Sequence, residues 1–410
     1  MSKFLSADIL LPDFTGIDGS RWATIACDQF TGEPEYWHSA EQTVGTSPST
    51  LRLMIPEAFL DETDVRVPTV NGTMQSYLEN ILELHESSMV YVKRTQSDGR
   101  VRYGIVGAID LEDYDYTHGS RSPIRATEGT VLSRIPPRVA VRQDAVIEMP
   151  HIMMLVNDPE NTVFSGISTT AAADYSFGLM FGGGSIEGRF LSTEEITSVQ
   201  QAIDALYAAT DPDNPLLFAI GDGNHSLATA KAIYEKNKAD LGDDATAHPS
   251  RYALVELVNI FDDALDFEPI YRVVQNVDPD TVLSAFADYI NGHSSPELGY
   301  EPQLIKALSA YGATEITVPH PHKKLTVATL QAFLDEYVAA NPEAIVDYIH
   351  GEDSLAGLAE KDRSVGFLFD GISKDGFFEA ILRDGAFPRK TFSMGHAQDK
   401  RYYIECRRIK

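Results

Sequence analysis

Residues 216–226 read LLFAIGDGNHS and join two patterns that predict different secondary structures. The run 216–220 is continuously apolar, which predicts a buried β-strand. From Ser226 to about Lys238, apolar residues recur at helical spacing, which predicts an α-helix. Strands and helices alternate irregularly along the rest of the chain. The sequence therefore predicts an α/β or mixed α+β fold.

The turn between this strand and this helix has the composition of an anion-binding loop. Glycines let the backbone approach a ligand closely, and the N–H groups at a helix start favour negative charge. The candidate phosphate-binding residues are Gly221, Asp222, Gly223, Asn224 and Ser226. Asp222 could also hold a metal ion, and His225 could exchange a proton. The alternative is a plain tight turn in which Asp222 or Asn224 caps the helix.

Two segments concentrate positive charge in a chain whose formal net charge is −28. Residues 125–142 carry four arginines and Glu128, and residues 388–408 include Lys390 and Thr391. Arginine forks suit phosphates and carboxylates, so Arg125 and Arg138 are candidate ligand-binding residues. The alternatives are a solvated charged loop for the first segment and a basic surface tail for the second.

Two further polar residues follow apolar stretches. Asp28 comes shortly after Trp22–Ala26, which places a carboxylate at the predicted end of a strand, where ligand-facing residues often lie. Arg272 follows Pro269 by three positions and could present a guanidinium to a site. A strand-terminating turn and a surface ion pair explain the two residues equally simply.

The composition disfavours several classes of protein. With 33 basic and 61 acidic side chains, nonspecific binding to nucleic acid or to anionic lipid is not expected. Cys27 and Cys406 lie far apart, which argues against a disulfide framework or a cysteine zinc site and favours a reducing, cytoplasmic setting. No apolar run approaches the roughly 20 residues of a membrane helix, and the acidic start argues against a signal peptide.

Shifts in pattern predict three parts, residues 1–110, 111–275 and 276–410. In the first part we expect a helix over Gln75–Glu86, followed by a hairpin. The two strands of this hairpin are predicted at Met89–Arg94 and Val101–Ile109.

The second and third parts carry further local signals. Ser192 and Glu195 form a capping-box pattern at the start of a helix. Gly183–Gly188 has the outer glycine spacing of a phosphate loop, but it lacks the lysine and hydroxyl residue that must follow, so a hairpin turn is expected. The apolar run Phe377–Leu382 predicts a strand in the third part.

Across nearly its whole length, the chain resembles the bacterial and archaeal domain-of-unknown-function family numbered 1015. The family motif A-D-G-H-H-R, with an alanine four positions further on, is matched by Gly221–Ser226 and Ala230. Asn224 and Ser226 replace the first histidine and the arginine of that motif. The family stretch H-E-x-T is matched at Glu128 and Thr130, and its late P-P-K-S-T-x-F pattern is matched loosely at 387–392.

The D-G-x-H core is also similar to the motif of the ParB/sulfiredoxin-like superfamily, whose members include kinases of free serine. This resemblance implies a ParB/sulfiredoxin-like core with an additional α+β part, and a nucleotide-dependent phosphotransferase using Mg²⁺ and ATP or ADP. The implied acceptor is a small hydroxyl metabolite, with L-serine as the leading candidate.

On this reading, each candidate residue has a role. The catalytic candidates are Asp28, Glu128 and His225; Arg138, Lys390 and Thr391 join the loop in binding phosphates; Arg125, Thr130 and Arg272 bind the acceptor; and Asp222 binds the metal. The alternative is a noncatalytic regulator that binds a nucleotide or metabolite at the same loop. A homodimer is compatible with either function.

Overall fold

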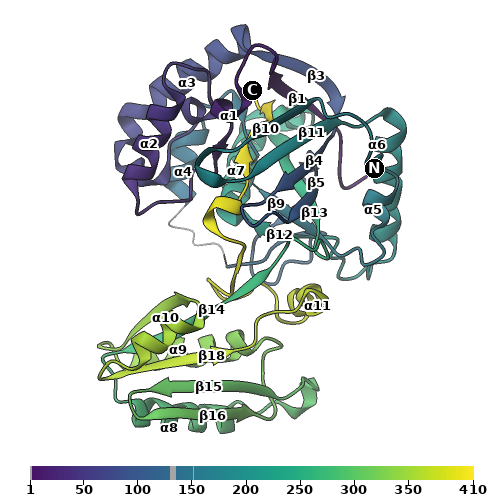
Figure 1. Ribbon diagram of the computed structural model, residues 1–410. Helices are drawn as coiled ribbons and strands as arrows, with labels where there is room; N and C mark the ends of the chain where they lie inside the picture. The colour runs from purple at the N-terminus through teal and green to yellow at the C-terminus, as the bar shows by residue number, and fades with distance from the viewer. Residues whose placement is uncertain (1, 130–134, 151) are drawn as a thin grey trace. The chain divides into compact units, whose positions relative to one another are not determined.

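The computed structural model describes residues 2–129, 135–150 and 152–410, and it divides into two compact units (Figure 1). Unit 1 comprises Met1–Leu265 and Gly395–Lys410, and unit 2 comprises Asp266–Met394. Both units combine helices with sheets, which confirms the predicted mixed α/β class. Residues 1–110 and the first 155 residues of the predicted part 111–275 lie together in unit 1, where strands from both pair in one sheet.

Unit 1 is built on a mixed nine-stranded sheet. In spatial order its strands are β10 (Tyr175–Gly178), β11 (Ser185–Phe190), β4 (Val90–Thr95), β5 (Val101–Asp110), β13 (Tyr252–Asn259), β9 (Met153–Val156), β12 (Phe218–Asp222), β7 (Ile124–Ala126) and β6 (Tyr114–Asp115). Three pairs are parallel: β13 with β9, β12 with β7, and β6 with β7. The predicted hairpin is confirmed as β4 and β5, and the predicted turn near Gly183 joins β10 to β11.

Both faces of this sheet are buried. Along β5, Val106 and Ala108 belong to one hydrophobic cluster, whereas Ile105 and Ile109 belong to another. Because successive side chains of a strand point to opposite faces, these two clusters lie on the two sides of the sheet. The helices of unit 1 are α1 (Gly19–Trp22), α2 (Pro34–Val44), α3 (Thr63–Asn80), α4 (Ile135–Arg142), α5 (Thr162–Ser165), α6 (Thr193–Ala208) and α7 (Asn224–Leu241).

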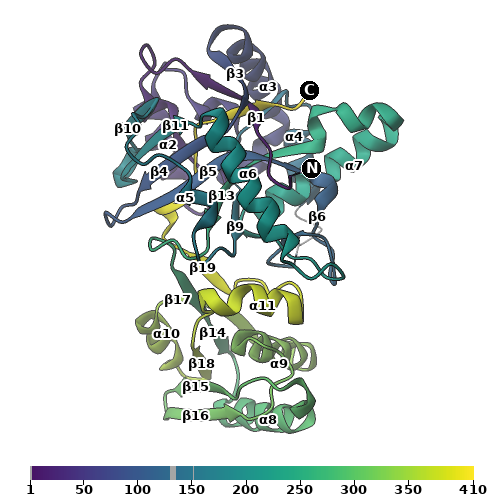
Figure 2. The same cartoon turned by 90° about the vertical axis from the view of Figure 1, so that its right-hand side faces the viewer.

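These helices divide between the two clusters. Helices α1, α2 and α3 supply buried residues to the first cluster, and α6 and α7 supply them to the second. Helices α5 and α6 pack together on one flank, as Figures 1 and 2 both show. Helix α4 packs against α7. Among the described residues, no helix is long and apolar enough to span a membrane.

The C-terminal segment of the chain returns to the N-terminal strands. A second sheet has the order β3 (Leu82–Ser88), β1 (Ala7–Pro12), β21 (Cys406–Arg408) and β8 (Ile147–Glu148). A separate pair joins β2 (Thr24–Ile25) to β20 (Tyr402–Tyr403). Two arginines of the basic tail, Arg401 and Arg407, are buried and therefore serve the structure of unit 1, whereas Arg408 is exposed.

A buried ionic network fixes this segment to the nine-stranded sheet. Arg401 Nε lies 3.0 Å from Glu256 Oε2, and Arg401 also pairs with Glu405. The Tyr175 hydroxyl donates to Glu405 Oε1 at 2.5 Å, and Arg102 Nη2 lies 3.4 Å from Glu256 Oε1. Charged groups removed from water need such partners, because an unpaired buried charge is strongly destabilising.

Unit 2 is an antiparallel sheet with four helices. Its main strand order is β16 (Gly312–Val318), β15 (Gln303–Ser309), β18 (Ser364–Phe369), β14 (Phe267–Gln275) and β17 (Ile345–His350), and β19 (Phe392–Met394) also pairs with β14. Its helices are α8 (Pro279–Gly292), α9 (Thr326–Ala340), α10 (Glu352–Ala359) and α11 (Lys374–Asp384). Phe286, Phe333 and Phe367 lie at the centre of its hydrophobic core.

Two local predictions are wrong. The helix expected over Gln75–Glu86 ends at Asn80, because the following residues pair with β1 as strand β3. The strand expected at Phe377–Leu382 is helix α11, whose start is capped by Ser373 accepting from Gly376 N at 3.1 Å. The capping box at Ser192 and Glu195 is confirmed at the start of α6.

Candidate functional site

The predicted strand-loop-helix is present as β12 followed by α7. Gly223 is the N-cap residue of α7 and has φ +83° and ψ 22°, in the left-handed region. Glycine occupies this region without the steric cost that a Cβ atom imposes. Because glycine has no side chain, Gly223 provides no side-chain cap to the first N–H groups of α7.

Asn224 joins the loop to the neighbouring strand. Its Oδ1 accepts from Thr127 N at 3.1 Å, and its Nδ2 donates to Thr127 Oγ1 at 3.2 Å. The Thr127 hydroxyl in turn donates to Ile220 O at 2.5 Å. Asn224 and Thr127 are buried, so these bonds fix the end of β7 against the end of β12. The side chain of Asn224 thus serves the shape of the loop.

Asp222 contacts a lysine from the C-terminal segment. Its Oδ1 accepts from Gly223 N at 3.1 Å, and its Oδ2 lies 3.4 Å from Lys400 Nζ. Lys400 is absent from the site predicted from the sequence, although it belongs to the basic segment noted there. Only the return of the C-terminal segment to unit 1 brings this cation to the loop.

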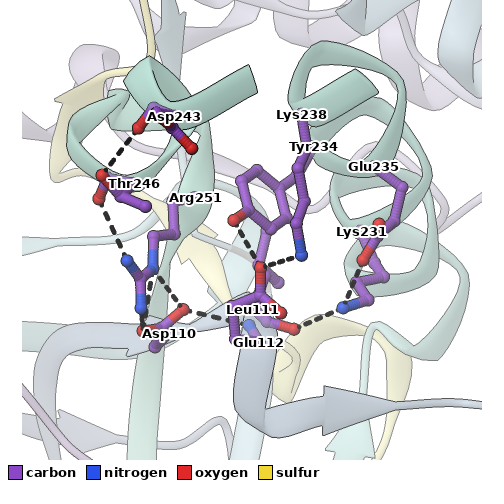
Figure 3. Close-up of polar contacts among 10 residues, drawn as sticks. All are labelled: Asp110, Leu111, Glu112, Lys231, Tyr234, Glu235, Lys238, Asp243, Thr246 and Arg251. Carbon is purple, nitrogen blue, oxygen red and sulfur yellow. Dashed lines mark hydrogen bonds and ion pairs between the residues drawn. The ribbon is translucent and has the colours of Figure 1, made fainter. Parts of the chain in front are cut away.

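The body of α7 is anchored by polar contacts that Figure 3 shows. Lys231 Nζ donates to Leu111 O at 2.8 Å, and Glu112 Oε1 accepts from Tyr234 at 2.6 Å and from Lys238 at 2.5 Å. The bond from Lys238 is the main cause of the lowered pKa of Glu112. These contacts span about two turns and restrict movement of the helix along and about its axis, and they thereby position its N-terminal loop.

A cavity of about 140 Å³ lies beside the first two turns of α7. Ser226 and Thr229 line it from α7, Arg138 and Arg142 line it from α4, and Cys27 lies on another side. Most of the remaining wall is apolar and includes Leu53, Met54, Ile55, Met74, Ala145 and Ile147. Two residues predicted to bind phosphate, Arg138 and Ser226, therefore meet at one cavity.

Two arginines and two glutamates line the cavity. Arg138 pairs with Glu57, and Arg142 pairs with Glu148. Glu148 also accepts from Arg407 Nε at 2.7 Å and from Leu254 N at 2.9 Å. Burial tends to raise the pKa of Glu148, but Arg407 and Arg142 outweigh it and lower that pKa. The two arginines that line the cavity are thus each paired with a glutamate of the same wall.

Cys27 and Tyr403 stay protonated at neutral pH. The Tyr403 hydroxyl donates to Cys27 Sγ at 3.3 Å. Burial raises the pKa of Cys27 to about 12, with the neighbouring Asp28 adding to the shift, and burial raises the pKa of Tyr403 well above 10. Neither residue is therefore an available base. Asp28 is half-buried, and its Oδ1 accepts from Gln29 Nε2 at 2.9 Å.

Among the described residues of unit 1, the predicted Arg125, Glu128 and His225 do not line this cavity. Arg125 is buried and donates to Ser122 O at 2.8 Å and to Asn214 Oδ1 at 2.7 Å, so it joins the loops that precede β7 and β12. Glu128 and His225 are half-buried, and both interact with other groups. Thr130 lies outside the described residues.

Three predicted residues belong to unit 2. Arg272 is fully buried, where its Nε donates to Gln331 Oε1 at 2.7 Å and its Nη1 donates to Lys390 O at 3.0 Å. Lys390 is exposed and has φ +56°, an uncommon conformation for a residue with a side chain. Thr391 is buried, and its hydroxyl donates to Pro388 O at 2.7 Å. Arg272 thus shapes the segment that presents Lys390.

Comparison with protein families identifies the group to which this sequence belongs. The model of the family described as protein of unknown function, DUF1015, matches residues 12–404. The chain belongs to the DUF1015 family. This DUF1015 protein places Lys400 beside the motif aspartate, whereas the arginine of the family motif is replaced by Ser226.

Several solved structures resemble this DUF1015 protein distantly. A free serine kinase mutant in complex with ADP has 10% identity and a TM-score of 0.39, covering 74% of this chain and 92% of its own. A conserved hypothetical protein from Pyrococcus furiosus has 12% identity and a TM-score of 0.35, covering 74% of this chain and 94% of its own. SbnI with a C-terminal truncation, from Staphylococcus aureus, has 11% identity and a TM-score of 0.34, covering 71% of this chain and 82% of its own. At these identities and TM-scores, the likenesses to solved structures assign no function. No curated protein matches the chain.

The described part of the chain contains no group of three or more His, Cys, Asp or Glu side chains that could hold a metal ion. Mg²⁺ that enters with a nucleotide takes phosphate oxygens and water as ligands and needs only one or two protein carboxylates. In this DUF1015 protein, Asp222 is a carboxylate at the loop, and it is already in contact with Lys400.

Proposed function

We propose that this protein is a nucleotide-dependent phosphotransferase that acts on the hydroxyl group of a small molecule. One observation carries the proposal: Arg138, Ser226 and Cys27, from three distant segments, line a single cavity. The sequence marks two of these segments as phosphate-binding and marks Asp28, next to Cys27, as a candidate base. Convergence of this kind is what a phosphoryl-transfer site needs, because its catalysis depends mainly on positioning and electrostatic stabilisation.

Each residue has a role in this proposal. The backbone of Gly221–Ser226 and the start of α7 bind the phosphates of ATP or ADP, with Arg138 and Lys400 neutralising negative charge. Lys400 takes the place of the motif arginine that Ser226 replaces. Asp28 or Glu128 accepts the proton of the acceptor hydroxyl, and His225 assists proton transfer. Asp222 contributes to binding Mg²⁺ that arrives with the nucleotide.

The predicted residues in unit 2 have more limited roles. Lys390 is exposed in unit 2, so this predicted phosphate ligand is accessible to an anion. Arg272 and Thr391 support it by holding residues 388–391 in place. We therefore propose that these two residues position Lys390.

A second candidate function is a regulator that binds a nucleotide or metabolite without transferring phosphate. The contacts of Asn224 and Asp222 favour it, because both side chains are bonded within the protein. Such a loop binds phosphate through its backbone without needing a correctly placed base. The two functions differ in whether the nucleotide is consumed.

Phosphorus NMR tests the proposal. The protein is mixed with Mg²⁺, ATP or ADP, and each member of a panel of hydroxyl compounds that begins with L-serine. A kinase gives new phosphoester signals that decrease by at least tenfold in Asp28→Asn, Glu128→Gln or His225→Ala. The exposed Glu86→Gln serves as a control of equal charge change. Nucleotide binding without consumption across the panel would favour the regulator, and absence of binding would overturn both candidates.

A further inference from the structure

We propose that the cavity beside α7 binds the carbon skeleton of the acceptor, and that this acceptor is an uncharged alcohol of about six non-hydrogen atoms. It is therefore neither an amino acid nor a hydroxy acid. The role of this ligand as an acceptor rests on the proposed function. Its binding does not, because the lack of charge follows from the residues that line the cavity.

The greater part of the cavity wall is hydrocarbon. Its apolar residues are Leu53, Met54, Ile55, Leu60, Met74, Val141, Ala145, Ile147 and Met149. An apolar cavity of about 150 Å³ stays dry and binds benzene, and this cavity measures about 140 Å³. A branched or cyclic carbon skeleton of this size fills it, whereas the hydroxymethyl group of serine would leave most of the wall unfilled.

The charged groups of the wall already neutralise one another. Arg138 pairs with Glu57, and Arg142 pairs with Glu148, so these four side chains together carry no net charge. Arg407 also contacts Glu148, but it does not line the cavity, and its other two nitrogens donate to backbone carbonyls. A charged ligand would lose its water on entering and would have to compete with an existing ion pair. An uncharged ligand avoids this cost.

Two uncharged polar side chains of the wall are also bonded within the protein. The Thr229 hydroxyl donates to His225 O at 2.8 Å, and the Tyr403 hydroxyl donates to Cys27 Sγ at 3.3 Å. Neither hydroxyl needs the ligand as an acceptor for its proton. The hydroxyl of a bound alcohol is therefore left for reaction.

Ser226 and Cys27 connect the cavity to the two groups that phosphoryl transfer requires. Ser226 lies in the first turn of α7, within the proposed phosphate loop, and Cys27 directly precedes the candidate base Asp28. In the transfer step, the hydroxyl oxygen forms a bond to the terminal phosphorus, and its proton passes to the carboxylate base. The bond from that phosphorus to the bridging oxygen of the nucleotide breaks.

NMR of the methionine methyl groups of the whole protein tests binding and its location together. Met54, Met74 and Met149 line the cavity, whereas Met89 lies in the second hydrophobic cluster of unit 1 and Met394 lies in unit 2. The protein is titrated with 3-methylbutan-1-ol without nucleotide, so that nothing is phosphorylated. We expect the signals of the three lining methionines to shift until saturation and those of the other two to stay in place. Absence of these shifts would overturn the proposal.

Charged probes of nearly the same shape test whether the ligand is uncharged. The carboxylate 3-methylbutanoate carries a negative charge at neutral pH, and 3-methylbutan-1-amine carries a positive charge. We expect the alcohol to bind at least tenfold more tightly than either. Equal or tighter binding of a charged probe would overturn the proposal. Displacement of the alcohol by adenosine would also overturn it, since the cavity would then hold the nucleoside.

Removing one acid from the wall tests the reason for this preference. Glu57→Gln gives the wall an excess positive charge and should strengthen binding of 3-methylbutanoate, relative to the alcohol, at least threefold. The exposed Glu86→Gln makes the same change in charge and should leave the relative affinities unchanged. Unchanged relative affinities in Glu57→Gln, shown to be folded by circular dichroism, would refute the paired charges as the cause.

Cavity-filling variants check the position of the bound alcohol. Val141→Phe and Leu60→Phe add volume at half-buried positions in the wall and should each weaken its binding by at least tenfold. Ala140→Phe places the same ring at an exposed position of α4 and should leave binding unchanged. Unchanged affinity in a folded cavity variant would place the alcohol elsewhere and contradict the assignment.

A turnover assay separates failure of this proposal from failure of the proposed function. If the alcohol binds in the cavity but no hydroxyl compound is phosphorylated, the binding site stands and the kinase function fails. If phosphorylation occurs but L-serine is a better acceptor than 3-methylbutan-1-ol, the kinase function stands and the uncharged acceptor is wrong.

Discussion

Asn224 and Thr127 bind each other through two hydrogen bonds, in which the Asn224 side chain both accepts from Thr127 N and donates to Thr127 Oγ1. Thr127 directly follows β7 and precedes Glu128, and Asn224 begins α7. The pair therefore joins the two predicted functional segments. Its position explains how an asparagine can occupy a motif position where the family commonly has histidine. The amide satisfies a buried backbone N–H and a buried hydroxyl at the same time.

Removing one member of this pair should destabilise the protein. We expect Asn224→Ala to lower the free energy of unfolding of unit 1 by about 1–3 kcal/mol, because it leaves buried polar groups of Thr127 without a partner. Urea denaturation followed by fluorescence measures the loss. The double variant Asn224→Ala with Thr127→Val should lose less than the sum of the single variants, whereas strict additivity would contradict the coupling.

The left-handed conformation of Gly223 predicts a cost for any side chain there. Gly223→Ala should lower the free energy of unfolding by at least about 1 kcal/mol, the usual penalty for an L-residue in this region. Gly72 provides a matched control, because it lies within α3 and a Cβ atom there meets nothing within 4 Å. Gly72→Ala should be neutral or stabilise by up to about 1 kcal/mol. Equal effects at the two glycines would rule out backbone strain as the cause.

Glu195 predicts a dependence of stability on pH. Hydrogen bonds from Arg189, together with the N–H groups of Ser168 and Ser192, lower its pKa from an ordinary 4.5 to about 2 against the effect of burial. A depressed pKa stabilises the folded state above pH 4.5, and this contribution disappears as the pH falls toward 2. At pH 7 the difference corresponds to roughly 3 kcal/mol.

Glu195→Gln should therefore destabilise the protein by roughly 2–3 kcal/mol at pH 7 and by about half as much at pH 3. Urea denaturation at both pH values measures this change. Glu194→Gln, at an exposed neighbouring position, is the control and should cost less than about 1 kcal/mol at either pH. A loss that is the same at pH 7 and pH 3 would show that the charge of Glu195 is not its source.

The raised pKa of Cys27 predicts a slow thiol. At pH 8 we expect iodoacetamide to alkylate Cys27 in the native protein at least roughly 100-fold more slowly than in the urea-unfolded protein, because only the thiolate reacts. Mass spectrometry of tryptic peptides separates Cys27 from Cys406. Replacing the hydroxyl that donates to its sulfur, in Tyr403→Phe, should not accelerate the reaction, since burial is the main cause of the shift. Rapid native alkylation would show that the thiol is open and ionised.

Sequence patterns predicted local structure correctly where all the residues that determine the structure lie in one short segment. The capping box of α6 depends on Ser192 and Glu195 alone, and the β4–β5 hairpin depends on two alternating strands around a short turn. Patterns failed where the tertiary structure supplied the cause. Leu82 fits a helix by spacing, but pairing with β1 places it in a strand.

The sequence by itself determined the mixed α/β class and the strand-loop-helix around Gly223, because apolar period and glycine chemistry act over a few neighbouring residues. Only the tertiary structure decided which polar side chains meet. It brought Arg138 and Ser226 to one cavity. It placed Lys400 beside Asp222. It also buried Arg125 and Arg272, each of which binds groups within its own unit. A charge in a sequence does not reveal its partner, since the partner depends on how distant strands and helices pack.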